Sequence, residues 1–359
     1  MYFLYDLIND PLPPTRLDDY LDRGYFRLGA GMYREDLTYH EGKFLNSFRT
    51  RLSLTDHALS KSQRKLLRRN ARFRIEYTDD TLTREHFEID RRYRYFRDRP
   101  AGNIRHVIRG MYSTENYFDT RQIKVYDGDR LVGYSFYDVG TRYGASLMGV
   151  YEPEYAKYSL GYYTMLLEME WLRDHGYVYY SPGSVTPGQR AMDYKRRVGP
   201  LDYFNVYQQQ WLPLADLDAP NDLAIHTVER RMLFLAAQLM ERGIPAGMGY
   251  YELYGIKAEM LERKTTLVDN YAAPIVLWLL PEGASEQFLV LFDYARQKWL
   301  VYHVPSIEGG FSYGFDEFHT ATVSQWLAFP RDHQILVDDE RIVNYLIQLC
   351  LHYIDRTRS

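Results

Sequence analysis

Residues 158–195 read YSLGYYTMLLEMEWLRDHGYVYYSPGSVTPGQRAMDYK, and this stretch decides the fold. Its first part predicts an apolar amphipathic helix over 160–175, which Gly161 opens. A short aromatic strand over 177–180 follows, and then a turn rich in proline and glycine over 181–188. Such a unit can hold an extended substrate near a helix N-terminus. We therefore expect acyl transfer here, with the rest of the chain delivering the two substrates.

The segment before this stretch predicts three antiparallel strands. They cover 122–126, 130–139 and 145–151, and the tight turn Asp127-Gly128-Asp129 closes the first hairpin. Three antiparallel strands, a helix and a crossover strand make a mixed sheet with flanking helices, so we expect the α+β class. This order, with a glycine at the start of the helix, resembles the skeleton of the GNAT-type acyltransferases.

The remaining elements predict a division of the chain into three parts. Helices are expected at 16–23, at 61–71 with Ser60 as its cap, and at 84–96, and a strand is expected at 44–54. The composition changes after residue 213. From there we expect helices at 222–242, 255–264 and 340–353 and strands at 275–280, 288–292 and 299–304. The predicted parts are an N-terminal segment (1–60), a GNAT-like domain (61–217) and an additional α+β domain (218–359) to which the sequence assigns no role.

Composition and charge narrow the class of protein. Cys350 is the single cysteine, so an internal disulfide or a thiolate cluster is excluded. No apolar run reaches the ~20 residues of a membrane span, and no signal peptide is visible, so we expect a cytoplasmic protein without a membrane partner. The net charge is −4. Residues 61–110 hold 15 Lys and Arg against 7 Asp and Glu, which predicts a basic patch for an anionic partner.

Five motifs in sequence order indicate a family. The segment Ser62–Asn70 (SQRKLLRRN) resembles the Ser-Gln-Arg-x-x-x-Arg-Arg-Asn signature of the arginyl-tRNA–protein transferases and their bacterial leucyl-transferring relatives. Asp22–Arg27 (DRGYFR) resembles the N-terminal Asp-Arg-Gly segment of that family. Tyr151-Glu152-Pro153, Ser159-Leu160-Gly161 and the run from Tyr179 to Pro200 follow its catalytic half. The resemblance covers about residues 15–205.

The resemblance implies that an amino acid, arginine or leucine, passes from aminoacyl-tRNA to a protein. The acceptor would be the α-amine of a protein that begins with an acidic residue. Because the donor ester is already activated, no ATP, metal or other cofactor is required. The implied partners are therefore aminoacyl-tRNA and the acceptor protein, and the sequence leaves the oligomeric state open.

The resemblance also supplies candidate site residues. Tyr180 or Tyr194 could donate to the carbonyl or stack on the terminal adenine, and Asp193 or Asp138 could accept the amine proton. Lys195, beside Arg196 and Arg197, could pair with the acidic side chain of the acceptor or with a phosphate. The expected catalytic residues are Tyr180, Asp193, Tyr194 and Lys195, and the expected substrate-binding residues are Ser159, Gly161, Gly183 and Arg196. The basic run would hold tRNA phosphates through Arg64, Lys65, Arg68 and Arg69.

The chain departs from the family pattern in one interval. Members usually carry a cysteine cluster between the Asp-Arg-Gly segment and the Ser-Gln-Arg motif. Residues 33–43 contain no cysteine, so we expect a solvated polar loop, with His40, Glu35, Asp36 and Glu41 as a conceivable replacement metal site.

Other interpretations of the sequence stay open. The same skeleton would serve an acyl-CoA-dependent N-acetyltransferase, but 157–161 is poorer in glycine and arginine than a turn that cradles the pyrophosphate of CoA. A non-catalytic relative that binds tRNA is a further alternative. Ser159 can equally be an ordinary helix cap, and the charges of 61–74 and 195–197 can equally be solvated surface. Glu168 and Glu170 are expected to be structural.

Overall fold

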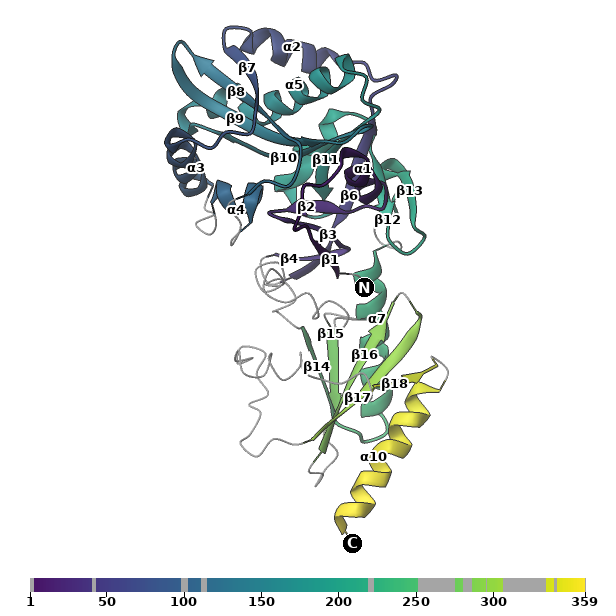
Figure 1. Cartoon of the computed structure of the whole chain (residues 1–359). Helices are drawn as coiled ribbons and strands as arrows, with labels where there is room; N and C mark the ends of the chain where they lie inside the picture. The colour runs from purple at the N-terminus through teal and green to yellow at the C-terminus, as the bar shows by residue number, and fades with distance from the viewer. Residues whose placement is uncertain are drawn as a thin grey trace.

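The computed structural model of the chain describes residues 3–40, 43–97, 103–110, 115–218, 223–250, 275–279, 286–294, 296–305, 334–338 and 341–358. Figure 1 shows two units, one built on an eight-stranded sheet and one on a five-stranded sheet. Helix α7 (Ala224–Met240) leads from one to the other. At its start the backbone N–H of Ile225 donates to Oδ1 of Asn46 at 3.3 Å.

The eight-stranded sheet has the strand order β13-β12-β6-β11-β10-β9-β8-β7. All neighbours are antiparallel except β10 and β11, which are parallel. The predicted meander, helix and crossover strand are therefore confirmed, and with them the α+β class and the GNAT-like arrangement. Its strands are β6 (Phe48–Ser53), β7 (Arg74–Asp79), β8 (Thr120–Asp127), β9 (Arg130–Val139), β10 (Tyr143–Tyr151), β11 (Tyr179–Val185), β12 (Asp202–Asn205) and β13 (Gln210–Pro213).

Strands β10 and β11 part soon after they meet. They pair over three residues only, Tyr143–Ala145 opposite Tyr179–Ser181. Beyond this point Gly183–Val185 of β11 stay paired with β6 on the other side. The two parallel strands therefore leave a fork at their carboxyl ends, which is where ligands bind in sheets with crossover connections.

The predicted turn at 181–188 is wrong over its first half, because β11 continues to Val185. Pro182 lies where the register with β6 shifts between Tyr180 and Gly183, and a residue in such a bulge needs no ladder N–H. Gly183 has φ +91°, a conformation that other residues rarely adopt. Pairing with β6, which comes from far away in the sequence, overrides the local turn signal.

The eight-stranded sheet is covered on both faces. Helix α5 (Leu160–Asp174) packs on β9 and β10 from one side. Helices α3 (Arg84–Phe96) and α4 (Ile104–Arg109) cover the other side, where their isoleucines meet Tyr134 and Phe136. Residues 131–139 of β9 are consequently buried along the whole strand instead of on alternate positions.

Two buried aspartates, Asp18 and Asp138, connect the N-terminal segment to this sheet by hydrogen bonds and an ion pair. Helix α1 (Pro14–Asp22) brings Asp18 to the β9–β10 loop, where its carboxylate accepts from the backbone N–H groups of residues 141–143 at 2.9–3.2 Å. Arg27 forms a buried ion pair with Asp138 at 2.7 Å. A three-stranded sheet completes the segment, made of β1 (Phe3–Leu7), β2 (Phe26–Leu28) and β3 (Gly31–Glu35). Because β6 belongs to the large sheet, residues before position 60 and residues after it share one sheet.

The expected polar loop at residues 33–43 is also wrong. Glu35 ends β3, and a hairpin of β4 (Leu37–His40) and β5 (Lys43–Asn46) follows. Asp36 between them is 2% exposed and accepts a hydrogen bond from the hydroxyl of Tyr207. The predicted strand at 44–54 is likewise two strands, β5 and β6, separated at Ser47.

In its described residues, the C-terminal unit consists of an antiparallel sheet and the helices α7 and α10. Its strand order is β14-β15-β16-β17-β18, and α7 packs on β14, β15 and β16. The elements after α7 are β14 (Ala246–Tyr250), β15 (Ile275–Leu279), β16 (Glu286–Asp293), β17 (Lys298–Pro305), β18 (Gln334–Val337) and α10 (Ile342–Arg358). The helix predicted at 255–264 lies outside the described residues, and the division of the chain at residue 217 stays a prediction.

A buried acid lies between α5 and the sheet. Glu168 of α5 is 0% exposed, and its Oε2 accepts a hydrogen bond of 2.7 Å from the hydroxyl of Tyr180 in β11. Burial raises the pKa of Glu168 to about 7, against the lowering effect of the hydroxyls of Tyr180, Ser135 and Ser146. Oε1 of Glu168 and Oγ of Ser135 are buried without a hydrogen-bond partner. A protonated carboxyl could donate to such an oxygen, which agrees with the direction of the shift.

Glu168→Gln should therefore change how stability depends on pH. The folded pKa of Glu168 is raised above its ordinary value of 4.5, so its contribution to stability is complete below that value and is lost as pH rises to about 7. Between about pH 5 and about pH 8, the free energy of unfolding of the Gln variant should rise by roughly 2–3 kcal/mol relative to the unchanged chain. Urea unfolding at both pH values measures this difference.

The half-buried Glu170 on the same helix supplies the control. Glu170→Gln should show a smaller dependence on pH, because its side chain is partly solvated. A Glu168→Gln variant whose stability followed that of the unchanged chain at both pH values would contradict the raised pKa.

Candidate active site

The structure brings Lys195 and Gly183 together beside the fork. Lys195 belongs to the 3₁₀ segment η2 (Arg190–Val198), which packs on β11 and on α5. A Cβ at Gly183 would come within 3.0 Å of Nζ of Lys195 and within 3.6 Å of the ring of Phe26. The missing side chain at position 183 therefore leaves room for the ammonium group against β11.

A second cation lies beside the same ring, and the sequence analysis missed it. Arg49 of β6 is 4% exposed, and its guanidinium lies 5.0 Å from the ring centre of Phe26 and 4.4 Å from that of Tyr33. Its Nη1 donates to the hydroxyl of Ser184. The signal was present, because Phe48–Ser53 (FRTRLS) places Arg49 and Arg51 on one face of a strand flanked by apolar residues.

Two of the expected proton-transfer residues are buried. Tyr180 is 0% exposed and uses its hydroxyl on Glu168. Asp138 is 0% exposed, and its Oδ1 accepts from Arg27 at 2.7 Å and from Thr120 at 2.6 Å. Burial raises the pKa of Asp138, and the neighbouring Arg27 opposes this rise. In this arrangement both groups stabilise the fold around the site and lie away from solvent.

The expected residues of η2 are open to solvent. Asp193 and Arg196 are exposed and lie 3.9 Å apart, and Tyr194 is 39% exposed. The end of η2 is fixed by Gln63 of α2 (Lys61–Asn70), whose Nε2 donates to the carbonyl oxygens of Arg197 at 2.9 Å and Val198 at 3.0 Å. The solvent-exposed side chains of η2 therefore extend from a backbone segment whose end is fixed by hydrogen bonds from Gln63.

The start of α5 differs from the simple cap that Ser159 suggested. A 3₁₀ segment, η1 (Pro153–Tyr158), precedes it, and Ser159 has φ +54° and makes no capping hydrogen bond with its side chain. Gly161 lies next to Tyr151, whose ring would be 3.6 Å from an added Cβ. This contact is of ordinary length, so the structure leaves space for a side chain at position 161.

The Ser-Gln-Arg signature divides into an inward and an outward face. Gln63 and Asn70 are buried, seven residues apart on α2, and Asn70 donates to the carbonyl of Tyr158 at 2.9 Å. Ser60 caps the helix, as predicted, and the structure shows that it also forms a capping box with Gln63. The four basic residues expected to bind tRNA, Arg64, Lys65, Arg68 and Arg69, are all exposed. The amides thus hold η1 and η2 in place, and the cations face solvent.

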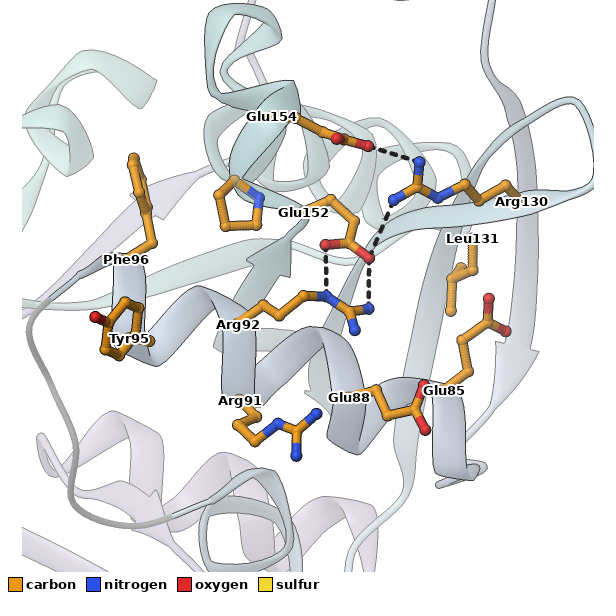
Figure 2. Close-up of a pocket in the computed structure, with 11 residues that line it drawn as sticks. Glu85, Glu88, Arg91, Arg92, Tyr95, Phe96, Arg130, Leu131, Glu152 and Glu154 are labelled. Atoms are coloured by element: carbon orange, nitrogen blue, oxygen red, sulfur yellow. Dashed lines mark hydrogen bonds and ion pairs between the residues drawn. The ribbon is translucent and has the colours of Figure 1, made fainter.

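A groove of about 1090 Å³ lies between α3 and η1 (Figure 2). The buried Glu152 of the Tyr-Glu-Pro motif holds Arg92 through two hydrogen bonds of 2.6 and 3.0 Å, and Arg130 reaches Glu152 and Glu154. These charges largely neutralise one another. Tyr95 at the end of the groove is 90% exposed, and Phe96 is 50% exposed.

The residues present do not fit the metal cluster of the family. Cys350, the single cysteine, is 2% exposed in α10 and belongs to the C-terminal unit. Where the family has cysteines, Asp36 accepts from Tyr207 and Glu35 lies 3.9 Å from Arg49, while Glu41 lies outside the described residues. Among the side chains that the structure describes, no group of three or more His, Cys, Asp or Glu is arranged to hold a metal ion.

Two curated proteins are similar to this chain in sequence. Proteins named aspartate/glutamate leucyltransferase from Stenotrophomonas maltophilia (strain K279a) and Ruegeria pomeroyi are 27% identical over 195 residues and 26% identical over 181 residues. The first match covers 52% of this chain and 75% of the relative, and the second covers 47% and 63%.

Solved structures with a similar arrangement are more distant. The C-terminal domain of a lysylphosphatidylglycerol synthetase from Agrobacterium fabrum matches with 14% identity and a TM-score of 0.33, over 49% of this chain and 54% of that chain. A tandem GNAT protein from the clavulanic acid pathway matches with 15% identity and a TM-score of 0.30, over 55% and 59%.

The family match lies on the part of the chain that forms the fork. The family model described as the C terminus of arginine-tRNA-protein transferase matches residues 75–205, from β7 to the end of β12. None of the helices in the described ranges is long and apolar enough to cross a membrane. Residues 75–205 are therefore similar to the C terminus of the arginine-tRNA–protein transferases, the family that the motifs of the sequence resemble.

Proposed function

We propose that this chain transfers arginine or leucine from aminoacyl-tRNA to the N-terminal α-amine of proteins that begin with an acidic residue. The family match over 75–205 and the names of the similar proteins support aminoacyl transfer. The observation that carries the proposal is the meeting of Lys195 with Gly183 beside the fork of β10 and β11. A cation at this place could hold the acidic side chain while the α-amine points to the donor.

The chemistry is aminolysis of an ester. The α-amine attacks the ester carbonyl carbon, the new C–N bond forms, the C–O bond to the ribose breaks, and the amine proton leaves to a base or to solvent. The pKa of an α-amine is near ~8, so a modest base frees it at neutral pH. The solvent-exposed Asp193 and Tyr194 of η2 can reach such a substrate, and orientation of the two reactants supplies much of the acceleration.

The outward face of α2 supports tRNA as the carrier of the donor. Lys65, Arg68 and Arg69 make no hydrogen bond or ion pair with other side chains in the described part of the chain, so their charges are available to phosphates. Asn70 and Gln63 join this helix to η1 and η2. A tRNA backbone on α2 would therefore lie next to the two segments that border the fork.

A transfer assay tests the proposal directly. The purified chain is incubated with arginyl-tRNA or leucyl-tRNA and with peptides that begin with Asp, Glu, Arg or Ala. The products are identified by mass spectrometry. We expect one added amino acid on the Asp and Glu peptides. Acetylated peptide from acetyl-CoA, with clear thermal stabilisation by that cofactor, would favour an N-acetyltransferase instead, and tRNA binding without any transfer would favour a non-catalytic relative.

Reversing the charges of Arg64, Arg68 and Arg69 to Glu should weaken tRNA binding at least 100-fold at about 0.1 M salt. Each cation on a phosphate releases a counterion, so the slope of the logarithm of affinity against the logarithm of salt concentration should fall by about 2 to 3. Filter binding over a salt series measures both quantities.

The matched control reverses Arg173, Arg230 and Arg242, which are also exposed and lie on α5, within α7 and just after α7. It changes the net charge by the same amount and should alter tRNA affinity far less. Equal losses in the two triple variants would show that α2 has no special part in binding.

Lys195→Ala should lower the rate of transfer to an Asp peptide about 10-fold or more and leave the melting temperature nearly unchanged. The half-buried Lys195 places its ammonium next to Gly183 at the fork, so we expect its loss to act on substrate more than on folding. Arg190→Ala, an exposed cation at the start of η2, is the control and should transfer at the normal rate. A Lys195→Ala variant as fast as this control would remove Lys195 from the site.

A further inference from the structure

Two arginines on the same face of β6 have different surroundings. Arg51 lies 4.4 Å from the ring centres of both Tyr179 and Trp211. Its guanidinium donates to the hydroxyl of Tyr143 at 2.7 Å and meets Asp202 at 3.5 Å and Asp22 at 3.6 Å. The positive charge of Arg51 is therefore neutralised by acidic side chains of this chain.

Arg49 also lies beside two rings, but of its three guanidinium nitrogens only Nη1 has a hydrogen-bond partner. Its Nε and Nη2 are buried without a hydrogen-bond partner, and the nearest carboxylate oxygen, of Glu35, is 3.9 Å from Nη2. A buried donor without an acceptor costs about 1–3 kcal/mol, and more when the group is charged. Such a group needs a physical explanation, and a ligand that supplies the missing acceptor is one.

The position of Arg49 indicates which ligand this is. The guanidinium lies beside Phe26, the ring that also borders Gly183 and Lys195. A planar carboxylate can accept two parallel N–H hydrogen bonds from a guanidinium, and it fits beside flat aromatic rings. A phosphodiester is tetrahedral and carries two bulky substituents, so it suits an open surface such as α2 better than a site that is 4% exposed.

We propose that Arg49 binds the side-chain carboxylate of the first residue of the acceptor protein, with Lys195 at the entrance to the same site. The inference rests on the proposed function and adds the residue that distinguishes an acidic from a neutral N-terminus. Ser184 and Glu35 hold the guanidinium in position, and the absence of a side chain at Gly183 keeps the approach open. Arg49 is thus a residue that determines specificity, and it touches the substrate away from the reacting atoms.

The test compares peptides that differ only in one charge. Binding and transfer are measured for peptides that begin with Asp or Asn, and for a second pair with Glu or Gln. The unchanged chain should prefer the acid. Arg49→Met keeps the bulk of the side chain and should lower affinity and kcat/KM for the acidic peptides about 10- to 100-fold, while the values for the amide peptides stay the same.

Two further variants separate recognition from folding. Arg49→Lys keeps the charge but not the planar fork and should retain part of the preference for acid, which a purely structural role would not produce. Arg51→Met is the matched control on the same strand. It should lower the melting temperature through its lost ion pairs and leave the ratio of acid to amide unchanged.

Three results would overturn the inference. One is an Arg49→Met chain, folded by circular dichroism, with the same ratio of acid to amide as the unchanged chain. A second is an equal loss for both peptides of a pair, which would point to a phosphate of the tRNA as the ligand. The third is an Arg49→Lys chain that has lost the preference completely.

The binding arm uses calorimetry with peptide and no tRNA, so it reports on Arg49 even where no transfer occurs. Preferential binding of acidic peptides without transfer would support Arg49 and contradict the proposed transferase. Equal transfer to acidic and amide peptides would contradict both the role of Arg49 and the acidic acceptor, and only aminoacyl transfer itself would remain supported.

Discussion

The architecture depends on how briefly β10 and β11 are paired. Three residues of each strand meet, and then β11 follows β6 while β10 runs on beneath the start of α5. Parallel pairing needs a crossover connection, which α5 provides, and the separation of the strands needs a second partner for β11, which β6 provides. The bulge before Gly183 turns the strand at the point of separation. The candidate site lies at this separation.

Buried polar contacts hold the elements around the fork in place, in addition to the apolar core that these elements share. Gln63 and Asn70 join α2 to the two 3₁₀ segments, Asp18 caps the β9–β10 loop, and Arg27 pairs with Asp138. Buried polar groups of this kind lose several hydrogen bonds at once when the chain rearranges, so they restrict the segments to one arrangement. Several of these buried polar residues belong to the motifs by which the chain resembles the family. The cations that would contact substrates lie on the segments that these residues hold in position.

Local pattern predicted most of the first unit well, because its helices and hairpins have strong periodicity and clear caps. The meander, α2, α3 and α5 were predicted from residues close together in the sequence, and Lys195 and Gly183 were selected by resemblance and do meet. The turn at 181–188 and the polar loop at 33–43 were wrong, because strand pairing with distant partners overrides weak local signals. Tyr180 and Asp138 are buried, which no local pattern of polar residues reveals.

The sequence by itself determined the fold class, the order of the elements and the resemblance to a family, because each depends on periodicity or on motifs in a fixed order. Only the tertiary structure decided which charged side chains face substrates and which face the core. Arg49 and Arg51 lie on the same face of one strand and each lies beside two aromatic rings, yet Arg51 pairs with two acids while Arg49 keeps two buried nitrogens without a hydrogen-bond partner. That difference arises because Asp22, Asp202 and Tyr143 come from three other segments of the chain. Their positions around β6 are set by packing, which a strand's own sequence does not encode.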